Sequence, residues 1–158
     1  MDYQFADLVK AYKQLGLKHG QIVHFKSNLA SLGILGGTDG RPVADREPIL
    51  ETHYRALREC IGSEGTITVS VASPSLMGTK TPFDPESTPS EMGVFSEYLR
   101  VRKDAIRSHH AFCSYAAEGP RAAAICSNTS RNDYGPFTPE QRMCELDAWD
   151  LTIGLEPN

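Results

Sequence analysis

The chain has no apolar run that approaches a membrane span, and it has little cysteine. A transmembrane helix needs roughly 20 consecutive apolar residues, and no stretch of the 158 residues comes near that length. The first ten residues are polar and amphipathic, unlike a signal peptide. The four cysteines are far apart and form no C-x-x-C pair, so we interpret them as free packing thiols. These absences predict a cytoplasmic protein with no membrane partner.

An excess of positive charge is also missing. The net charge of -4 excludes the strongly basic surface that non-specific nucleic-acid binding needs, although it is compatible with a polycationic ligand. The sequence contains no G-x-S-x-G hydrolase motif, no internal repeat and no long biased tract. Apolar residues at 40% and charged residues at 23% are typical of globular proteins. We therefore expect one folded domain over residues 1–158.

Helical and strand patterns alternate along the chain. Apolar residues at helical spacing, glycines at helix ends and two capping-box sequences, at 88–91 and 138–141, indicate helices. The helices are expected over residues 5–15, 48–61, 89–101 and 120–126, and from 139 onward. Runs rich in β-branched and aromatic residues predict strands over 21–26, 66–72, 111–117 and 149–155. This order predicts a layered α/β/α fold with a mainly parallel sheet.

The first candidate binding segment, Lys26–Gly33, follows the first expected strand. Ligands of parallel α/β sheets bind beyond the carboxyl ends of the strands. Backbone N–H groups at a helix start, together with Lys26 and the hydroxyls of Ser27 and Ser31, suit a pyrophosphate. An ordinary strand-to-helix turn capped by Ser27 explains the same residues, so both interpretations stay open.

A second candidate is the sequence Arg-Ser-His-His at 107–110. A guanidinium offers paired donors to an anion, so Arg107 and Ser108 are reasonable phosphate contacts. A solvated polar turn is the equal alternative. The adjacent histidines, His109 and His110, point in different directions and have no third ligand at a recognisable interval, so we expect no metal.

Three carboxylates, Asp84, Glu91 and Glu97, form the third candidate. Carboxylates that line a cleft can bind ammonium groups of a substrate. Asp84 stands before Pro85, however, and this pair commonly initiates a turn. The turn is the simpler interpretation from the residues alone.

Four motifs, in order, resemble those of the antibiotic N-acetyltransferase family, whose named members are aminoglycoside 3-N-acetyltransferases. Lys26–Gly33 is similar to the family's H-S-S-L-S-S-L-G segment, and Gly62–Ile67 to its G-P-D-G-T-L strand entry. Phe83–Arg100 resembles F-D-P-x-x-T-P-S-x-M-G-x-x-x-E-x-x-R, and Arg107–Pro120 resembles R-S-x-H-P-x-x-S-x-x-A-x-G-P. Lys26 stands where named enzymes often have histidine, and Ala111 replaces a proline.

The resemblance implies acetyl transfer from acetyl-CoA, without a metal, to the 3-amino group of an aminoglycoside. An amino sugar of a polysaccharide pathway as acceptor, and a non-catalytic coenzyme-binding remnant, are the alternatives. The resemblance also implies that two segments, Lys26–Gly33 and Arg107–His110, contact the coenzyme. The candidate contacts are Lys26, Ser27, Asn28, Leu29, Ser31, Gly33, Arg107, Ser108 and His110.

The family's catalytic histidine and glutamate would lie beyond Asn158. We therefore expect a fold that is truncated at the carboxyl end, and negligible acetyltransferase activity for residues 1–158 alone.

Overall fold

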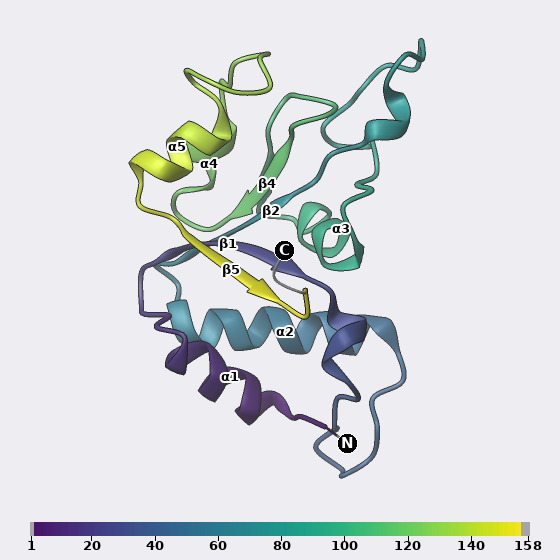
Figure 1. The fold of residues 1–158 in the computed structure, drawn as a ribbon, viewed down its shortest axis with the longest axis vertical. Coiled ribbons are helices and arrows are strands. Elements are labelled where there is room, and N and C mark those ends of the chain that lie inside the picture. Colours follow the sequence, from purple (N-terminus) through teal and green to yellow (C-terminus); the bar gives the residue numbers. More distant parts are fainter. Residues whose placement is uncertain (1, 156–158) are drawn as a thin grey trace.

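A computed structural model describes residues 2–155 and arranges them as a five-stranded sheet with helices on both faces (Figure 1). The strands are β1 Ile22–Ser27, β2 Thr66–Ser70, β3 Ala105–Arg107, β4 Tyr115–Glu118 and β5 Trp149–Ile153. The α-helices are α1 Phe5–Gln14, α2 Arg46–Ile61, α3 Val94–Arg100, α4 Ala122–Cys126 and α5 Pro139–Glu145. Two 3-10 turns, η1 Leu29–Leu32 and η2 Pro74–Leu76, follow β1 and β2. Within 2–155 no helix is both long and apolar enough to cross a bilayer.

The sheet has the strand order β3-β4-β2-β1-β5. β1 pairs in parallel with β2 and β5, whereas β4 runs antiparallel to both β2 and β3. The predicted α/β fold with a mainly parallel sheet is therefore confirmed, with β4 as the single reversed strand of the described sheet. Ser27, Ser70, Arg107 and Ile153, which end their strands, lie at one edge with Tyr115, which begins β4. We call this the carboxyl edge.

The larger core lies between the sheet and a layer formed by α1, α2 and α3 (Figure 1). Val23 and Phe25 of β1 point into it, because side chains alternate along a strand. Phe25 meets the ring of Tyr12 at a centroid distance of 6.3 Å and that of Phe95 at 4.8 Å. One strand thereby joins α1 and α3 to the same core.

The opposite face carries α4 and α5 and a smaller, more polar core. Its apolar cluster contains Ile22, Ala117, Ala122, Ile125, Cys126 and Met143. His24 and Thr68, which lie on this face, are buried, and His24 Nδ1 is 2.9 Å from Thr68 Oγ1. Two helices of five and seven residues cover this face of the sheet.

Two local expectations were wrong. The capping-box sequence at 88–91 starts no helix, because the Glu91 carboxylate accepts from Ser75 instead, and α3 begins only at Val94. The expected strand over 111–117 is β4 from Tyr115 onward, preceded by the three-residue β3, which the sequence did not indicate. At the second sequence the N-cap is confirmed, since the Thr138 side chain accepts from Gln141 N at the start of α5, whereas the Gln141 side chain accepts from Phe137 N instead of Thr138 N.

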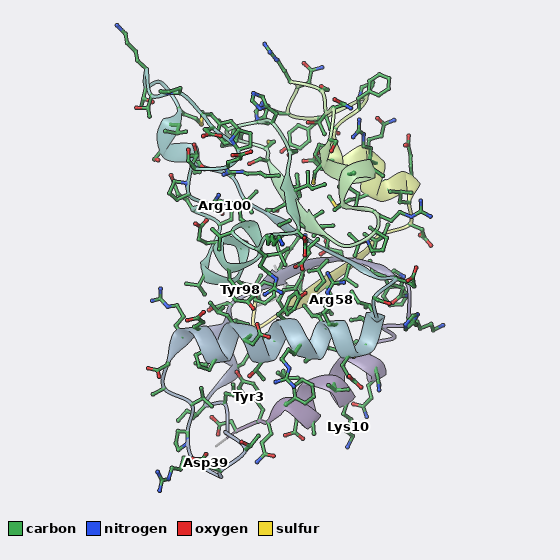
Figure 2. The ribbon with its side chains drawn as sticks, turned by 180° about the vertical axis from the view of Figure 1, so that it is seen from behind. Tyr3, Lys10, Asp39, Arg58, Tyr98 and Arg100 are labelled. Carbon is green, nitrogen blue, oxygen red and sulfur yellow. The ribbon has the colours of Figure 1, made fainter. Side chains whose placement is uncertain are left out.

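A cluster of arginines and tyrosines joins α2, α3 and β4 away from the carboxyl edge. Figure 2 shows Arg58 and Tyr98 on the side of α2 that faces the sheet. Glu118 of β4 is 7% exposed and accepts from Arg102 at 2.9 Å and from the Tyr54 hydroxyl at 3.0 Å. A buried carboxylate is costly without such partners. We assign this cluster to the scaffold and not to the site.

Candidate functional site

The segment after β1 is a short 3-10 turn, where the sequence indicated a loop or a helix start. Residues 29–32 form the 3-10 turn η1, with Asn28 at the cap position. The Asn28 amide donates to Ser31 Oγ at 2.7 Å, and its backbone N–H donates to Ile153 O at 3.0 Å. Ser27 is half-buried and caps nothing, so its expected capping role is wrong. Among residues 2–155 its hydroxyl has no hydrogen-bond partner.

Lys26 is the exposed cation of this segment. Its Nζ lies 2.6 Å from Asp150 Oδ2 of β5, and 43% of the side chain is exposed. Surface pairs of this kind contribute little to stability because solvent screens them. The ammonium group therefore remains available to an anion at the carboxyl edge.

Leu29 and Gly33 serve packing. Leu29 belongs to the larger core, so only its backbone can face a ligand, which corrects the expected side-chain contact. Gly33 has a φ of +87°, and a Cβ there would stand 2.3 Å from Asp2 Oδ2. The Asp2 carboxylate accepts from Ile34 N at 2.8 Å. The positive φ therefore favours glycine where the amino-terminal segment crosses this loop.

Arg107 at the end of β3 is used within the protein. Its guanidinium donates to Ser114 Oγ at 3.2 Å and Ser73 Oγ at 3.0 Å, and also to the carbonyls of Thr88 and Val71. Burial lowers the pKa of Arg107 to about 10. We correct the expected phosphate contact accordingly, because these acceptors occupy all three guanidinium nitrogens and fasten the loop after β2 to the sheet.

The structure does not bring the two motif segments into direct contact. β1 and β3 are separated by β2 and β4, so Ser27 and Arg107 stand three strand spacings apart, roughly 14 Å. Arg107 lines a cavity of about 530 Å³ together with Arg100 and Lys103. This cavity lies beside β3 and contains no residue of 26–33.

Ser108 and His110 shape the loop between β3 and β4. Ser108 is 1% exposed, and its Oγ accepts from Tyr115 N at 2.9 Å, so its side chain is engaged within the protein and is not displayed at the surface. Nδ1 of His110 accepts from the backbone N–H of Phe112 at 3.1 Å and of Cys113 at 2.8 Å. Nε2 of His110 must then carry the proton, and it lies 3.0 Å from Asp133 Oδ1.

This tautomer bears on metal binding. The ligand atoms of His110, Cys113 and Asp133 lie within 4.8 Å of one another, a spacing that can hold a metal ion. A metal needs the lone pair of the imidazole nitrogen that faces it, and here that nitrogen is protonated. The geometry favours a hydrogen-bonded loop over a metal site.

Asp84 forms the turn that its position before Pro85 indicated. Its carboxylate accepts from Glu86 N at 3.0 Å and from Ser87 Oγ at 2.6 Å. The Ser87 hydroxyl, and then the Glu86 amide, hold the pKa of Asp84 below its usual value. The side chain thus stabilises its own turn.

Glu91 and Glu97 are also engaged internally. Glu91 accepts from the backbone and the hydroxyl of Ser75. Glu97 forms a two-pronged pair with Arg100, at 2.8 and 2.7 Å, which lowers its pKa, and it accepts from Ser90 N at 2.8 Å. The expected gathering of three acceptor carboxylates is therefore not observed.

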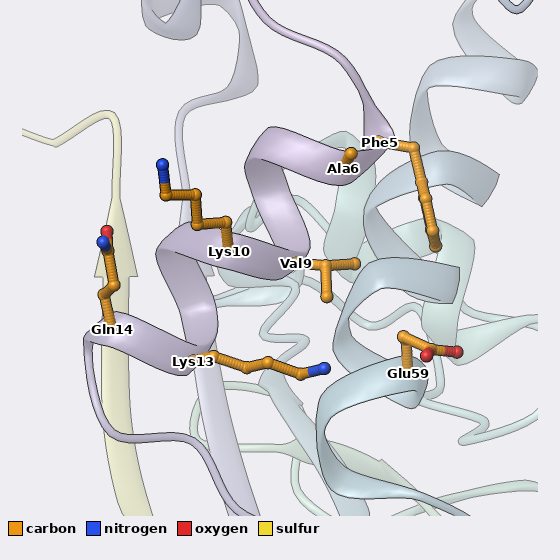
Figure 3. A pocket seen from close by; sticks show the side chains of 7 residues that line it. All are labelled: Phe5, Ala6, Val9, Lys10, Lys13, Gln14 and Glu59. Carbon is orange, nitrogen blue, oxygen red and sulfur yellow. The ribbon is translucent and has the colours of Figure 1, made fainter.

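A groove of about 570 Å³ lies between α1 and α2 on the outside of the molecule (Figure 3). Phe5 and Val9 point toward α2 in this view, whereas Lys10 extends away from it. No residue that follows a strand contributes to the groove. A smaller cavity of about 240 Å³ does lie at the carboxyl edge, between the end of β2, the start of β4 and the start of α5.

His24 links β1 to that smaller cavity. Its ring centroid is 5.4 Å from that of Tyr115, which lines the cavity, and burial lowers the pKa of His24 to about 4. Desolvation disfavours the charged imidazolium. His24 is consequently neutral at physiological pH.

A family model described as aminoglycoside 3-N-acetyltransferase matches residues 4–158. This chain belongs to the aminoglycoside 3-N-acetyltransferase family. Aminoglycoside N(3)-acetyltransferase IV from Salmonella sp is 30% identical over 98% of this chain and 56% of its own length. Aminoglycoside N(3)-acetyltransferase VII from Streptomyces paromomycinus is 27% identical over 93% and 54%. The chain thus spans about half the length of these acyltransferases.

Solved members of the family share the fold. AAC-VIa bound to sisomicin superposes with a TM-score of 0.81 at 27% identity, over 99% of this chain and 61% of that one. The apoenzyme of aminoglycoside acetyltransferase AAC(3)-IVa gives 0.79 at 28% identity, over 98% and 56%. The resemblance inferred from the four motifs is confirmed.

Sequence inspection missed the side chains around the smaller cavity. Tyr115 and Glu140 are 25 positions apart in the sequence. Tyr115 falls on an unspecified position of the motif over 107–120, and Glu140 lies outside all four motifs. Glu140 lies in the first turn of α5, where a glutamate is common, so its identity did not indicate a binding role.

Proposed function

We propose that this chain binds acetyl-CoA at the carboxyl edge and takes part in acetyl transfer to the 3-amino group of an aminoglycoside. The observation that carries the proposal is the family match over residues 4–158. Solved relatives at 27–28% identity are complexes with sisomicin, apramycin and a gentamicin. All three are aminoglycosides, which supports an amine acceptor of this class.

The coenzyme would bind against the segment after β1. Lys26 supplies an exposed positive charge, and Ser27 supplies a hydroxyl free of other partners within residues 2–155. The first amides of η1, at Leu29 and Ala30, have no acceptor within a 3-10 turn. One cation, one hydroxyl and two amides form a cradle suited to a pyrophosphate. The Asn28 side chain would act by holding Ser31.

Transfer also needs a base, because an amine that is largely protonated must lose a proton before it attacks a thioester. His24 has a pKa of about 4, which is too low for an efficient base at neutral pH. His53 is fully buried, and both nitrogens of His110 are hydrogen-bonded. We therefore propose that residues 1–158 alone bind coenzyme without turning over.

Isothermal titration calorimetry of the full chain with coenzyme A tests the binding site. Lys26→Gln should weaken binding about fivefold, because one exposed charge contact contributes about 1 kcal/mol. Lys10→Gln is the matched control, since it removes a lysine from the outer groove. No coenzyme binding by the unaltered chain, or equal losses in both variants, would refute the site.

A thioester-consumption assay with kanamycin or gentamicin tests the second part. We expect no release of free thiol above the rate without protein. Turnover near that of a full-length family member would show that a base within residues 1–158 suffices.

A further inference from the structure

The small cavity at the carboxyl edge has an aromatic lining with one carboxylate. Phe112, Tyr115 and Tyr134 contribute rings, and Glu140 contributes the acid. Phe112 and Tyr134 are 42% and 73% exposed, so the cavity opens to solvent on their side. Its volume of about 240 Å³ is below the roughly 300–1,000 Å³ of sites for drug-sized ligands, so it fits a single ring or one arm of a larger molecule.

The Glu140 carboxylate is incompletely satisfied. Its Oε2 is buried and has no hydrogen-bond partner among the described residues. The pKa of the nearby Tyr115 hydroxyl is raised first by burial and then by Glu140. A buried acceptor without a partner is destabilising, and the penalty is greater for a charged group. Oε2 itself is shielded from solvent, so a cation in the cavity would act on the carboxylate as a whole by compensating its charge.

Neighbouring charges make the cavity electronegative. Burial raises the pKa of the Cys113 thiol, and the charges of Asp133 and Glu140 raise it further. No lysine or arginine is among the residues that line the cavity. Arg142 of α5 donates to the carbonyls of Ser127 and of other residues around the end of α4, so it is held by other acceptors.

We propose that this cavity binds the ammonium group of an organic amine, with Glu140 as the counter-ion and Phe112, Tyr115 and Tyr134 as the surrounding aromatic faces. Ammonium groups are attracted to the negative faces of aromatic rings and to carboxylates. The identification of this amine as the acetyl acceptor rests on the proposed function. The binding of an ammonium group does not, because it follows from the cavity alone.

Nuclear magnetic resonance titration of the full 15N-labelled chain tests the proposal. Cyclohexylammonium is the probe and cyclohexanol its neutral counterpart, so the two differ mainly in charge at one substituent. We expect cyclohexylammonium to shift the amides of Cys113 and Tyr134 saturably, and cyclohexanol to do so at least about tenfold more weakly. This comparison needs no substitution and so cannot be confounded by misfolding.

Two variants locate the charge. Glu140→Gln should weaken cyclohexylammonium binding about tenfold or more, because it keeps the shape but removes the counter-ion. Glu145→Gln is the matched control, since Glu145 lies on the same helix and bonds to Gln141 outside the cavity. Equal binding of the alcohol, no saturable shift, or unchanged affinity in Glu140→Gln would overturn the proposal. Coenzyme calorimetry is independent of these outcomes, so the two proposals fail separately.

Discussion

His53 should make the stability of this protein depend on pH. The side chain is fully buried on α2, with Nε2 3.1 Å from the Tyr3 hydroxyl and Nδ1 3.3 Å from the Tyr12 hydroxyl. Neither phenol supplies a negative charge at neutral pH, so burial dominates and lowers the pKa of His53 from 6.5 to about 4. The folded protein therefore holds this imidazole neutral where the unfolded chain would protonate it.

The sign and size of this pH dependence follow from the difference in proton binding between the folded and unfolded states. Between pH 6.5 and about 4 the unfolded state binds one more proton at His53, so the stability contribution is full above pH 6.5 and is lost as the pH falls. One pKa unit corresponds to about 1.4 kcal/mol, so moving from pH 7.5 to pH 5 costs about 2 kcal/mol at this residue. His24, with a similar pKa of about 4, adds a loss of the same sign.

Urea unfolding at pH 7.5 and pH 5 measures this effect. A His53→Gln variant keeps a side chain that can hydrogen-bond to both tyrosines but cannot titrate. Its free energy of unfolding should fall by about 2 kcal/mol less than that of the unaltered chain over this interval. His19→Gln, at an exposed histidine, controls for the change in net charge. Equal pH dependence in His53→Gln and the unaltered chain would show that His53 is not held neutral by burial.

Two further substitutions test the scaffold around the site. Arg107→Lys should increase cleavage by limited proteolysis within residues 74–89, because a single ammonium group cannot replace the contacts that fasten this loop; an unchanged digestion pattern would contradict that role. Gly119→Ala should cost at least about 2 kcal/mol in thermal or urea unfolding, because its φ is +130° and the new Cβ would stand 2.4 Å from Gly65 O. Gly20→Ala, with a φ of +82° and open space, should cost about 1 kcal/mol and serves as the comparison.

The sequence predicted those elements that depend on consecutive residues and not on pairing with distant segments. The apolar periodicity of α2 and the β-branched run of β2 are properties of consecutive residues, and both were located within a few positions. Thr138 was identified as a cap for the same reason. The three-residue β3 was missed because it exists through pairing with β4, which no local pattern reports.

The sequence predicted a candidate site residue correctly only where the exposure of its side chain follows from its place at the end of a strand. Lys26 was expected at the carboxyl edge and lies there with its ammonium group exposed. Ser108 and Leu29 stand in the same motif segments but are buried, because their orientation depends on which neighbours pack over them. The role of Arg107 as an internal fastener depends on acceptors from two distant segments, Val71–Ser73 and Thr88. Composition and spacing cannot reveal such a convergence.

The two proposals place charges of opposite sign along one edge of the sheet. Lys26 lies near the end of β1 and pairs with Asp150 of β5, whereas Glu140 lies beside the end of β2 and the start of β4. A phosphate-bearing donor and an ammonium-bearing acceptor would each be attracted to one part of this edge and repelled from the other. His24 of β1 contacts Tyr115 of the cavity, and its neutrality at physiological pH adds no positive charge beside Glu140. Exchanging the signs, by Lys26→Glu with Glu140→Lys, should therefore weaken the binding of both coenzyme A and cyclohexylammonium, whereas each single substitution should weaken mainly one of them.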